Sequence, residues 1–570
     1  MSGAKSELAA LAAEMWDALV EREPFAAMST GQPVVRFPRG DLAEARAVAD
    51  SARLRRDRLD RIDPSQLDRD DRLTAAYLRH LLQDEIERPD LWWTGFGIAP
   101  YSGSGLAILA SRLFPSFDLA DAGQADRYVS LAAQCADAVV AMRERVEMQA
   151  ERGWRLPRPA IAGARRSLEG MASMVSSAIM LGDDRGADAA TRKSVVTIVE
   201  DRLRPAFSAL LAAIGSDYEA AAPEAAGIMH QPGGAKAYRR WIRHHLGFDV
   251  DPAEIHAIGF EEVARLAGVM QRVRIEHFGH DGNEASFHER LRCDPNAKAV
   301  SVDALEASYR RHLDRMEAAF PRFFRQGPRA KGRLARLPLE QEAGMTFGYY
   351  VPPREVGGDG TYFYSGNGVP DRLQLNRAAL IFHELVPGHH VQIARQQENG
   401  ELPDIRRQRF SATAFLEGWA EYASSLAGEA GLYDDPYDLY GFLSHQRFVA
   451  QRLVVDTGLN ALGWSLAEAR AYMEANTIEQ PEQVTSEILR YATDLPGQAL
   501  CYRMGYLKFR AIRDAAQETL GPAFELPDFH EAILAQGTLP LPVLEMNIAD
   551  WALDRAANAP ARIDQVAGQS

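Results

Sequence analysis

The sequence contains few cysteines and no long apolar run. Its 570 residues include three cysteines, Cys135, Cys293 and Cys501, which are odd in number and too far apart for a CxxC metal pair or a disulfide framework. No stretch has 18 uninterrupted apolar residues, and acidic residues such as Glu7 and Asp17 interrupt the N-terminal segment. We therefore expect neither a transmembrane helix nor a signal peptide, and we predict a cytoplasmic protein with reduced thiols.

An excess of positive charge is also missing. Lys and Arg number 64 against 79 Asp and Glu, which gives a net charge of −15. Such a field repels phosphate backbones and anionic lipids, so neither nucleic acid nor a membrane surface is an expected partner. Hydrophobic residues make up 46% and charged residues 25%. This composition is typical of a folded globular protein and excludes a chain disordered throughout. Nothing in it indicates the oligomeric state.

Apolar residues recur mostly at helical spacing. Leu8, Leu11, Met15 and Leu19 lie on one face of a predicted helix near the start of the chain. Similar patterns occupy residues 41–60, 70–86, 126–151, 187–214, 253–275, 302–325, 409–428, 440–456, 466–476 and 498–518. They predict a mainly α fold with a large helical body.

Two short segments have the character of strands. Met345–Val351 and Thr361–Tyr364 are rich in aromatic and β-branched residues, and the turn-forming run Pro352–Gly360 separates them. They predict a small hairpin or sheet edge just before the candidate metal-binding motif described below.

The best candidate for a boundary is the stretch Gln326–Leu337, which contains Gly327, Pro328 and Gly332. It would separate subdomains 1–330 and 331–570. Because helices are predicted on both sides of it, we expect a single domain over residues 1–570.

A candidate metal-binding motif ends an apolar helical run at His383-Glu384. Neutral imidazoles suit zinc, and a Glu beside the first ligand suits a general base. The position four residues after His383, where a helical zinc motif carries its second His, is Pro387. Pro387 disfavours helical geometry, and Gly388 permits a tight or left-handed turn. A local bulge is therefore predicted, with His389 or His390 as the second ligand; the spacing leaves both open.

A third ligand is expected from the apolar helix that contains Glu417 and Glu421. These residues are four apart and share one helical face. One carboxylate can bind the metal while the other accepts a hydrogen bond from a ligand imidazole. Two histidines and a carboxylate also describe iron(II) oxygenases, but the adjacent Glu384 and the helical setting favour Zn²⁺ and hydrolysis.

The motifs His-Glu-x-x-Pro-Gly-His-His and Glu-Gly-Trp-Ala-Glu-Tyr resemble those of domain-of-unknown-function family 885 (DUF885), a large bacterial family. The resemblance runs from Met15 to Leu541 and includes the segments Val455–Gly458 and Pro496–Gly505. In architecture this family is similar to helical zincin metallopeptidases such as angiotensin-converting enzyme and the thermostable carboxypeptidases. The family pattern usually has a His after Asp-Thr-Gly-Leu, where this chain has Asn460, which implies an altered or weakened role at that position.

The resemblance implies a site in which His383, His389 and Glu417 hold Zn²⁺, with Glu421 as the supporting carboxylate and His390 as the alternative ligand. Glu384 would take a proton from the attacking water and give one to the leaving amine. A phenol from the region of Tyr502 would stabilise the oxyanion, unless this tyrosine only packs at the edge of the core.

Three further residues are candidates for substrate binding. Arg490 and Arg503 can hold a substrate carboxylate by bidentate hydrogen bonds, or can be solvated helix charges. The strand that ends at Tyr364 can pair with an extended peptide backbone. We therefore predict a zinc metallopeptidase that acts on oligopeptides. The alternatives are a zinc amidase or deacylase of a small metabolite, and a metal- or peptide-binding protein without catalysis.

Overall fold

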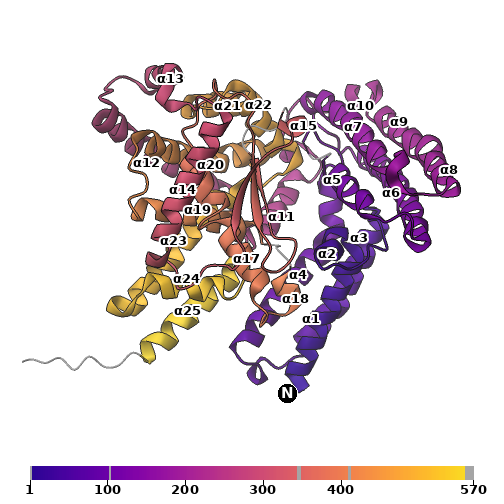
Figure 1. Cartoon of the computed structure of the whole chain (residues 1–570), viewed down its shortest axis with the longest axis horizontal. Coiled ribbons are helices and arrows are strands. Elements are labelled where there is room, and N and C mark those ends of the chain that lie inside the picture. The colour runs from indigo at the N-terminus through magenta and orange to yellow at the C-terminus, as the bar shows by residue number, and fades with distance from the viewer. Residues whose placement is uncertain (1–2, 102–103, 343–347, 409–411, 559–570) are drawn as a thin grey trace, which may run out of the picture.

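A computed structural model describes residues 3–101, 104–342, 348–408 and 412–558. Most of these residues are helical, and a small sheet accompanies the helices (Figure 1). The predicted mainly α fold with a small β element is thus confirmed. The first residues of the predicted strand, 345–347, and of the predicted helix, 409–411, lie outside the described residues.

The helices fall into two length groups. The long helices are α1 (Gly3–Arg22), α3 (Leu42–Asp60), α4 (Arg69–Thr94), α6 (Ala122–Glu151), α7 (Arg158–Ile179), α12 (Pro252–Phe278), α14 (Val302–Ala319), α19 (Thr413–Glu429), α20 (Pro436–Ala461), α23 (Leu500–Leu520) and α25 (Leu541–Ala557). The shorter ones are α2 (Pro24–Ser29), α5 (Ser104–Leu113), α8 (Ala189–Ile198), α9 (Arg204–Ala213), α10 (Ser216–Ala220), α11 (Gly234–Leu246), α13 (Glu284–Cys293), α15 (Leu339–Glu342), α16 (Arg377–Glu384), α17 (His389–Glu398), α18 (Asp404–Arg407), α21 (Leu466–Asn476), α22 (Pro481–Leu489) and α24 (Leu526–Leu534).

Local sequence signals explain where several helices begin. The side chains of Asp41, Asp68 and Asp121 each accept a hydrogen bond from a backbone N–H in the first turn of α3, α4 and α6. Ser465 and Glu468 form a capping box at the start of α21. Each interaction satisfies backbone N–H groups that the helix itself leaves unpaired.

Three strands form the sheet in the order β1 (Gly332–Arg336), β3 (Gly360–Tyr364), β2 (Gly348–Val351). β2 and β3 pair antiparallel, which confirms the predicted hairpin for its described part. β1 pairs parallel with β3 and was not predicted; it lies inside the candidate boundary Gln326–Leu337. Tyr362 and Tyr364 of β3 are buried and contact Tyr309 of α14, so this face of the sheet packs against a helix.

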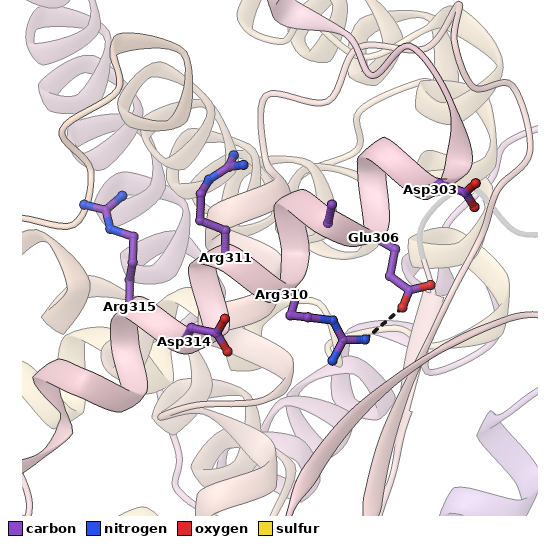
Figure 2. A pocket seen from close by; sticks show the side chains of 7 residues that line it. Asp303, Glu306, Arg310, Arg311, Asp314 and Arg315 are labelled. Carbon is purple, nitrogen blue, oxygen red and sulfur yellow. Dashed lines mark hydrogen bonds and ion pairs between the residues drawn. The ribbon is translucent and has the colours of Figure 1, made fainter.

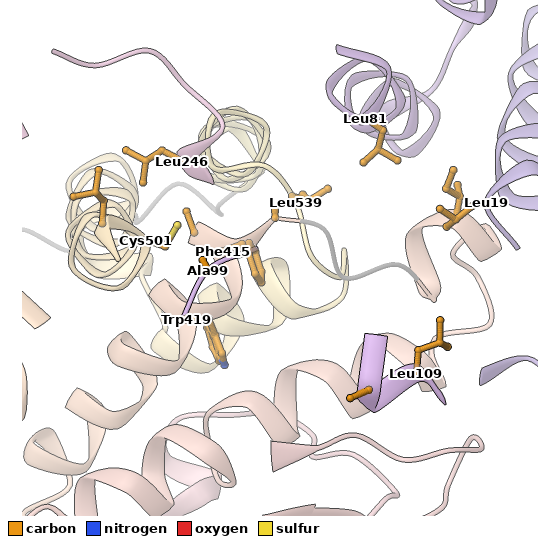
Figure 3. Close-up of a cluster of buried hydrophobic side chains, with 14 of the residues drawn as sticks. Leu19, Leu81, Ala99, Leu109, Leu246, Phe415, Trp419, Cys501 and Leu539 are labelled. Carbon is orange, nitrogen blue, oxygen red and sulfur yellow. The ribbon is translucent and has the colours of Figure 1, made fainter. Parts of the chain in front are cut away.

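The sheet and α17 lie between two groups of helices. In Figure 1, α5–α10 lie on one side of the sheet, and α12–α14 and α20–α22 lie on the other. One apolar cluster includes residues from both groups, from Leu8 in α1 to Ala552 in α25. Figure 3 shows part of it, with Leu19 and Leu81 from the N-terminal helices and Phe415 and Trp419 from α19. Continuous burial of apolar surface of this kind stabilises the packing of both groups of helices.

Candidate metal centre

The helix that carries the first candidate ligand is interrupted completely. α16 ends at Glu384, and a new helix, α17, begins at His389. The Val386–Pro387 peptide bond is cis, and Gly388 has φ −77°, so its turn is not left-handed. A Cβ on Gly388 would lie 1.8 Å from the carbonyl oxygen of His383, so only glycine fits there. The predicted bulge is therefore a break between two helices, which lets His389 turn back toward α16.

His383, His389 and Glu417 present their ligand atoms to one point. Nε2 of His383 is 3.6 Å from Oε2 of Glu417, and Nε2 of His389 is 3.5 Å from the same oxygen. Candidate ligand atoms of the three residues all lie within 4.8 Å of one another. Two ligands at the usual distance from a tetrahedral zinc ion lie roughly 3.3–3.6 Å apart. The donor set and its spacing therefore fit a zinc ion.

His390 is placed elsewhere. Its Nδ1 is 3.0 Å from the hydroxyl of Tyr350, and its Nε2 is 3.1 Å from the carbonyl oxygen of Ala330. The ring is buried and both nitrogens have partners. Of the two alternatives that the spacing left open, the geometry brings His389 to Glu417 and uses His390 to attach α17 to the sheet.

Glu421 lies behind His383 and is fully buried. Its Oε1 is 3.2 Å from Nδ1 of His383, without the alignment of a full hydrogen bond, and 2.8 Å from Nε2 of His445. Its Oε2 accepts a hydrogen bond of 2.5 Å from the amide of Gln446. Burial alone would raise the pKa of the Glu421 carboxyl, but His445 and His383 lower it below its usual range. Glu421 is therefore an ionised carboxylate that can orient a ligand imidazole.

His383, Glu421 and His445 form a second group of candidate ligands within 4.8 Å of one another. The two groups share His383, whose Nε2 faces Glu417 and whose Nδ1 faces Glu421. A neutral imidazole has one lone pair and one N–H, so only one of its nitrogens can bind a cation. Glu417 with two imidazoles, supported by Glu421 on the far nitrogen, is the usual carboxylate–histidine–zinc arrangement.

The pKa values of Glu417 and Glu384 are shifted in opposite directions. Burial would raise the pKa of Glu417, but His383 and His389 hold it well below its usual range, so this carboxylate stays charged. The pKa of Glu384 is raised, chiefly by burial and further by Glu417. Its carboxyl group makes no hydrogen bond to the rest of the described chain. A ligand carboxylate beside a more basic, unpaired carboxylate is the division of roles expected of a metal ligand and a general base.

Tyr502 lies at this centre, as the family resemblance implied. Its ring is stacked on that of His383, with centroids 6.4 Å apart and planes 15° apart. The guanidinium of Arg452 lies 4.6 Å from the centre of the Tyr502 ring, and burial raises the pKa of the phenol. The hydroxyl is thus kept protonated and can donate a hydrogen bond.

The substrate role predicted for Arg503 is wrong. Its side chain is 1% exposed, donates a hydrogen bond of 2.6 Å to Oε1 of Gln446, and forms an ion pair with Glu262. A guanidinium that is already bound and enclosed offers no donors to a substrate carboxylate. Arg503 instead holds Gln446, which in turn holds Glu421.

Tyr364 also differs from its predicted role, whereas the substrate role of Arg490 stays a prediction, because the Arg490 side chain is 36% exposed. Arg490 is paired with Glu487 at 2.9 Å. Tyr364 is buried and donates a hydrogen bond of 2.5 Å to Glu306. Its strand cannot receive a peptide, because β3 is the central strand and both of its edges are already paired, with β1 and β2. The prediction of peptide pairing at Thr361–Tyr364 is therefore wrong.

Asn460, where the family pattern has His, is a structural residue in this chain. Its side chain accepts a hydrogen bond from the N–H of Ile228 and donates to Asp456 and to the carbonyl oxygen of Tyr491. It follows His445 by fifteen residues on α20, which is about 22 Å along a helix. Asn460 therefore ties the end of α20 to two neighbouring segments.

Sequence reasoning missed several residues at the centre. His445 and Gln446 lie on α20, more than twenty residues after Glu421 in the sequence, so no motif spacing connects them to it. The hydroxyl of Tyr362 is fully buried and finds no hydrogen-bond partner in the described part of the chain. Glu384 is among the charges that raise the pKa of this phenol. In the sequence, the one sign of His445, Gln446 and Tyr362 is that each is a polar side chain within a largely apolar stretch.

A surface pocket elsewhere is unrelated to this centre. Seven residues of α14 line it, including Glu306 and Arg310, which form an ion pair of 2.9 Å one turn apart (Figure 2). None of the candidate ligands belongs to it. Paired charges on one exposed helix are usual for a solvated surface.

Comparison with known proteins gives a family and a fold. The profile of the family described as "Bacterial protein of unknown function (DUF885)" matches residues 24–548. The crystal structure of the "putative lipoprotein from Colwellia psychrerythraea" is 25% identical, with a TM-score of 0.84 over 97% of this chain and 100% of that one. A "putative lipoprotein of unknown function from Shewanella oneidensis" is 15% identical, with a TM-score of 0.75 over 95% and 99%. The search of curated proteins gave no significant match.

These relatives contradict the predicted location. Both are described as putative lipoproteins, so the expectation of a cytoplasmic protein is wrong. The cytoplasmic prediction depended on the lack of a long apolar run and of an apolar N-terminal segment. Such a lack does not identify the compartment in which a protein works. Within the described residues, no helix has the length and apolar character needed to cross a membrane.

Proposed function

This chain belongs to the DUF885 family of bacterial proteins, as its motifs indicated, and we propose that it is a zinc-dependent hydrolase that cleaves amide bonds in oligopeptides. The main support is the convergence of His383, His389 and Glu417 beside Glu384. Two imidazoles and one carboxylate are a common ligand set of catalytic zinc sites, which leave one position for water or substrate.

The similarity of the sequence motifs to helical zincins supports the same proposal. In those enzymes a His-Glu pair on one helix is completed by a Glu on a later helix. Here α16 carries His383-Glu384 and α19 carries Glu417, and Glu421 follows one turn later. The break at Pro387-Gly388 replaces the continuous helix of the common motif, yet the distances between His383, His389 and Glu417 remain suited to zinc.

Each side chain of the centre has a separate role in the proposed reaction. Zn²⁺, when bound by His383, His389 and Glu417, would polarise the scissile carbonyl and acidify water. Glu384, whose pKa is raised, accepts the proton of the attacking water. Tyr502 donates a hydrogen bond to the oxyanion as the carbonyl becomes tetrahedral. Glu421 keeps the hydrogen of His383 on Nδ1, so that Nε2 is free to bind the metal.

Metal analysis and peptide cleavage together test this function. Purified protein is expected to contain about one zinc per chain and to cut defined bonds in a peptide library followed by mass spectrometry. Glu384→Gln should keep its zinc and lose activity by about 10²–10⁴-fold, because only the proton acceptor is removed. Glu401→Gln, the same change at an exposed position, is the matched control and should cleave like wild type.

Two results would reject the proposal. One is a Glu384→Gln variant that cleaves as fast as wild type. The other is a Glu417→Ala variant that keeps its full zinc content, because this would remove Glu417 from the ligand set. If iron rather than zinc is found in stoichiometric amount, the oxygenase alternative replaces hydrolysis.

A further inference from the structure

Arg452 of α20 is a cation beside the candidate metal centre. Its guanidinium carbon lies 4.6 Å from the centre of the Tyr502 ring, and that ring is stacked on the ring of His383 with centroids 6.4 Å apart. The two distances limit how far Arg452 can lie from His383. Together they equal about three residues of extended chain at roughly 3.3–3.6 Å each. Arg452 is therefore within reach of one end of a peptide whose scissile bond lies at the candidate ligands.

Only part of the Arg452 guanidinium is engaged within the protein. Nε donates to the hydroxyl of Tyr491 at 3.0 Å, and Nη2 donates to Oε2 of Glu487 at 3.1 Å. Nη1 makes no hydrogen bond to any described residue and is not buried, and the side chain is 14% exposed. A guanidinium has five N–H groups in a planar fork, so three of them remain for a ligand.

Buried partners fix the orientation of these free donors. Glu487 is 2% exposed and Tyr491 is 3% exposed, and the Tyr491 hydroxyl also donates to Glu487. Tyr491 belongs to the π-helical turn Arg490–Asp494, which follows α22. Turns of this rare kind occur frequently at functional sites. A guanidinium held in this way from the interior loses little conformational freedom when it binds a ligand.

Positive charge is in excess around Arg452. Oε1 of Glu487 also accepts a hydrogen bond of 2.9 Å from Nη1 of Arg490, so that one carboxylate pairs with two guanidinium groups. Glu479 is a further carboxylate within electrostatic reach of Arg452, but it forms no ion pair with any described residue. Burial raises the pKa of Glu479, which favours its neutral form. An anionic group on a ligand would therefore balance the charge at this place.

We propose that Arg452 binds the C-terminal carboxylate of the substrate, an inference that rests on the hydrolase function proposed above. The enzyme would then remove residues from the free carboxyl end of peptides. The planar fork of free N–H groups matches a carboxylate in both shape and charge. The contact between the two groups occupies part of the separation between Arg452 and His383. One or two residues therefore fit between the scissile bond and the carboxylate.

Two peptides of the same sequence test this inference, one with a free C-terminal carboxylate and the other with a C-terminal amide. Binding is measured by calorimetry on the zinc-loaded Glu384→Gln protein, in which the proposed base is replaced. The free acid should bind about 10–100-fold more tightly than the amide, as expected for hydrogen bonds to a charged group. Adding Arg452→Met should abolish this difference, because only the acid loses a partner.

Cleavage gives a second measurement. Mass spectrometry should show that wild type releases one or two residues from the free acid, with a kcat/KM about 10–100-fold above that for the amide. Arg452→Met should bring this acid-to-amide ratio close to one. Arg452→Lys keeps the charge but not the planar fork, so its ratio should lie between those of wild type and Arg452→Met.

Arg470→Met is the matched control. It makes the same change at an arginine of the neighbouring helix α21 whose side chain is 39% exposed, and its ratio should equal that of wild type. Arg452 also packs on Tyr502, and a disturbance of that ring would slow both substrates alike. The acid-to-amide ratio therefore distinguishes carboxylate binding from a supporting role.

Three results would reject the inference while leaving the hydrolase function in place. They are equal binding and cleavage of acid and amide by wild type, cleavage only at bonds more than two residues from the C-terminus, and a preference for the acid that survives Arg452→Met. A wild-type protein that binds no zinc or cleaves neither peptide would reject the hydrolase function, and the role of Arg452 with it.

Discussion

A Cβ atom on Gly418 in α19 would lie 2.5 Å from the Cα of Gly505 in α23. The backbones of the two helices therefore touch at this pair of glycines. Glu417 and Glu421 lie on either side of the contact on α19, and Tyr502 precedes it by three residues on α23. The close crossing sets how far these three side chains stand from His383.

The first prediction concerns this contact. Gly418→Ala should push α19 away from α23, because real Cβ atoms do not approach a backbone so closely. We expect unfolding free energy to fall by about 1–3 kcal/mol, as is typical of overpacking, and zinc affinity to fall with it. Denaturant titration and competition with a chelator measure the two effects.

Gly428→Ala on the same helix is the control for Gly418→Ala. Its added Cβ would meet only an ordinary contact, 3.8 Å from the ring of Tyr433. The variant should be as stable as wild type or up to about 1 kcal/mol more stable, because alanine favours a helix over glycine. A Gly418→Ala protein with undiminished stability and zinc affinity would show that the crossing does not control the centre.

The second prediction separates the adjacent histidines. His389→Gln should lose stoichiometric zinc with little change in stability of the metal-free protein. His390→Gln should keep zinc but lose about 1–3 kcal/mol of unfolding free energy, because Tyr350 and the carbonyl of Ala330 lose a buried partner. Elemental analysis after dialysis, and denaturation with chelator present, provide the two measurements. The opposite pattern would assign the ligand role to His390.

The third prediction concerns pH and a buried histidine away from the metal. Burial lowers the pKa of His530 to about 3. Its Nδ1 donates to the carbonyl oxygen of Phe323 at 2.8 Å, and its Nε2 is 2.8 Å from the hydroxyl of Tyr422, an arrangement that satisfies the neutral ring. The unfolded chain binds a proton at its ordinary pKa near 6.5, whereas the folded chain does not.

The stabilisation from neutral His530 is therefore present above about pH 6.5 and is lost as the pH falls toward 3. The loss amounts to about 1.4 kcal/mol per pH unit for this residue. Denaturant titrations from pH 7.5 to 4.5 should show a shallower dependence in His530→Gln than in wild type. NMR of the ring nitrogens should show no protonation of His530 in folded wild type above pH 5. Identical slopes in the two proteins would contradict this assignment.

Local patterns were sufficient for much of the fold. Helical periodicity predicted α3, α6 and α20 within a few residues at most ends, because a long amphipathic stretch buries one face in almost any packing. The hairpin β2–β3 followed from its aromatic residues and intervening turn. The partner strand β1 was missed, since Gly332–Arg336 has no alternating apolar pattern and is a strand only because β3 lies beside it.

Some features of the candidate metal centre could likewise be predicted from local sequence, and others could not. The sequence by itself determined that a helix stops near Pro387-Gly388 and that Glu417 and Glu421 share one helical face, because proline sterics and helical spacing act within a few residues. Only the tertiary structure decided that His389 turns to Glu417, that His445 joins Glu421, and that Arg503 is enclosed. These relations depend on how α16, α19, α20 and α23 cross, and crossing is set by contacts between residues far apart in the chain, such as Gly418 and Gly505.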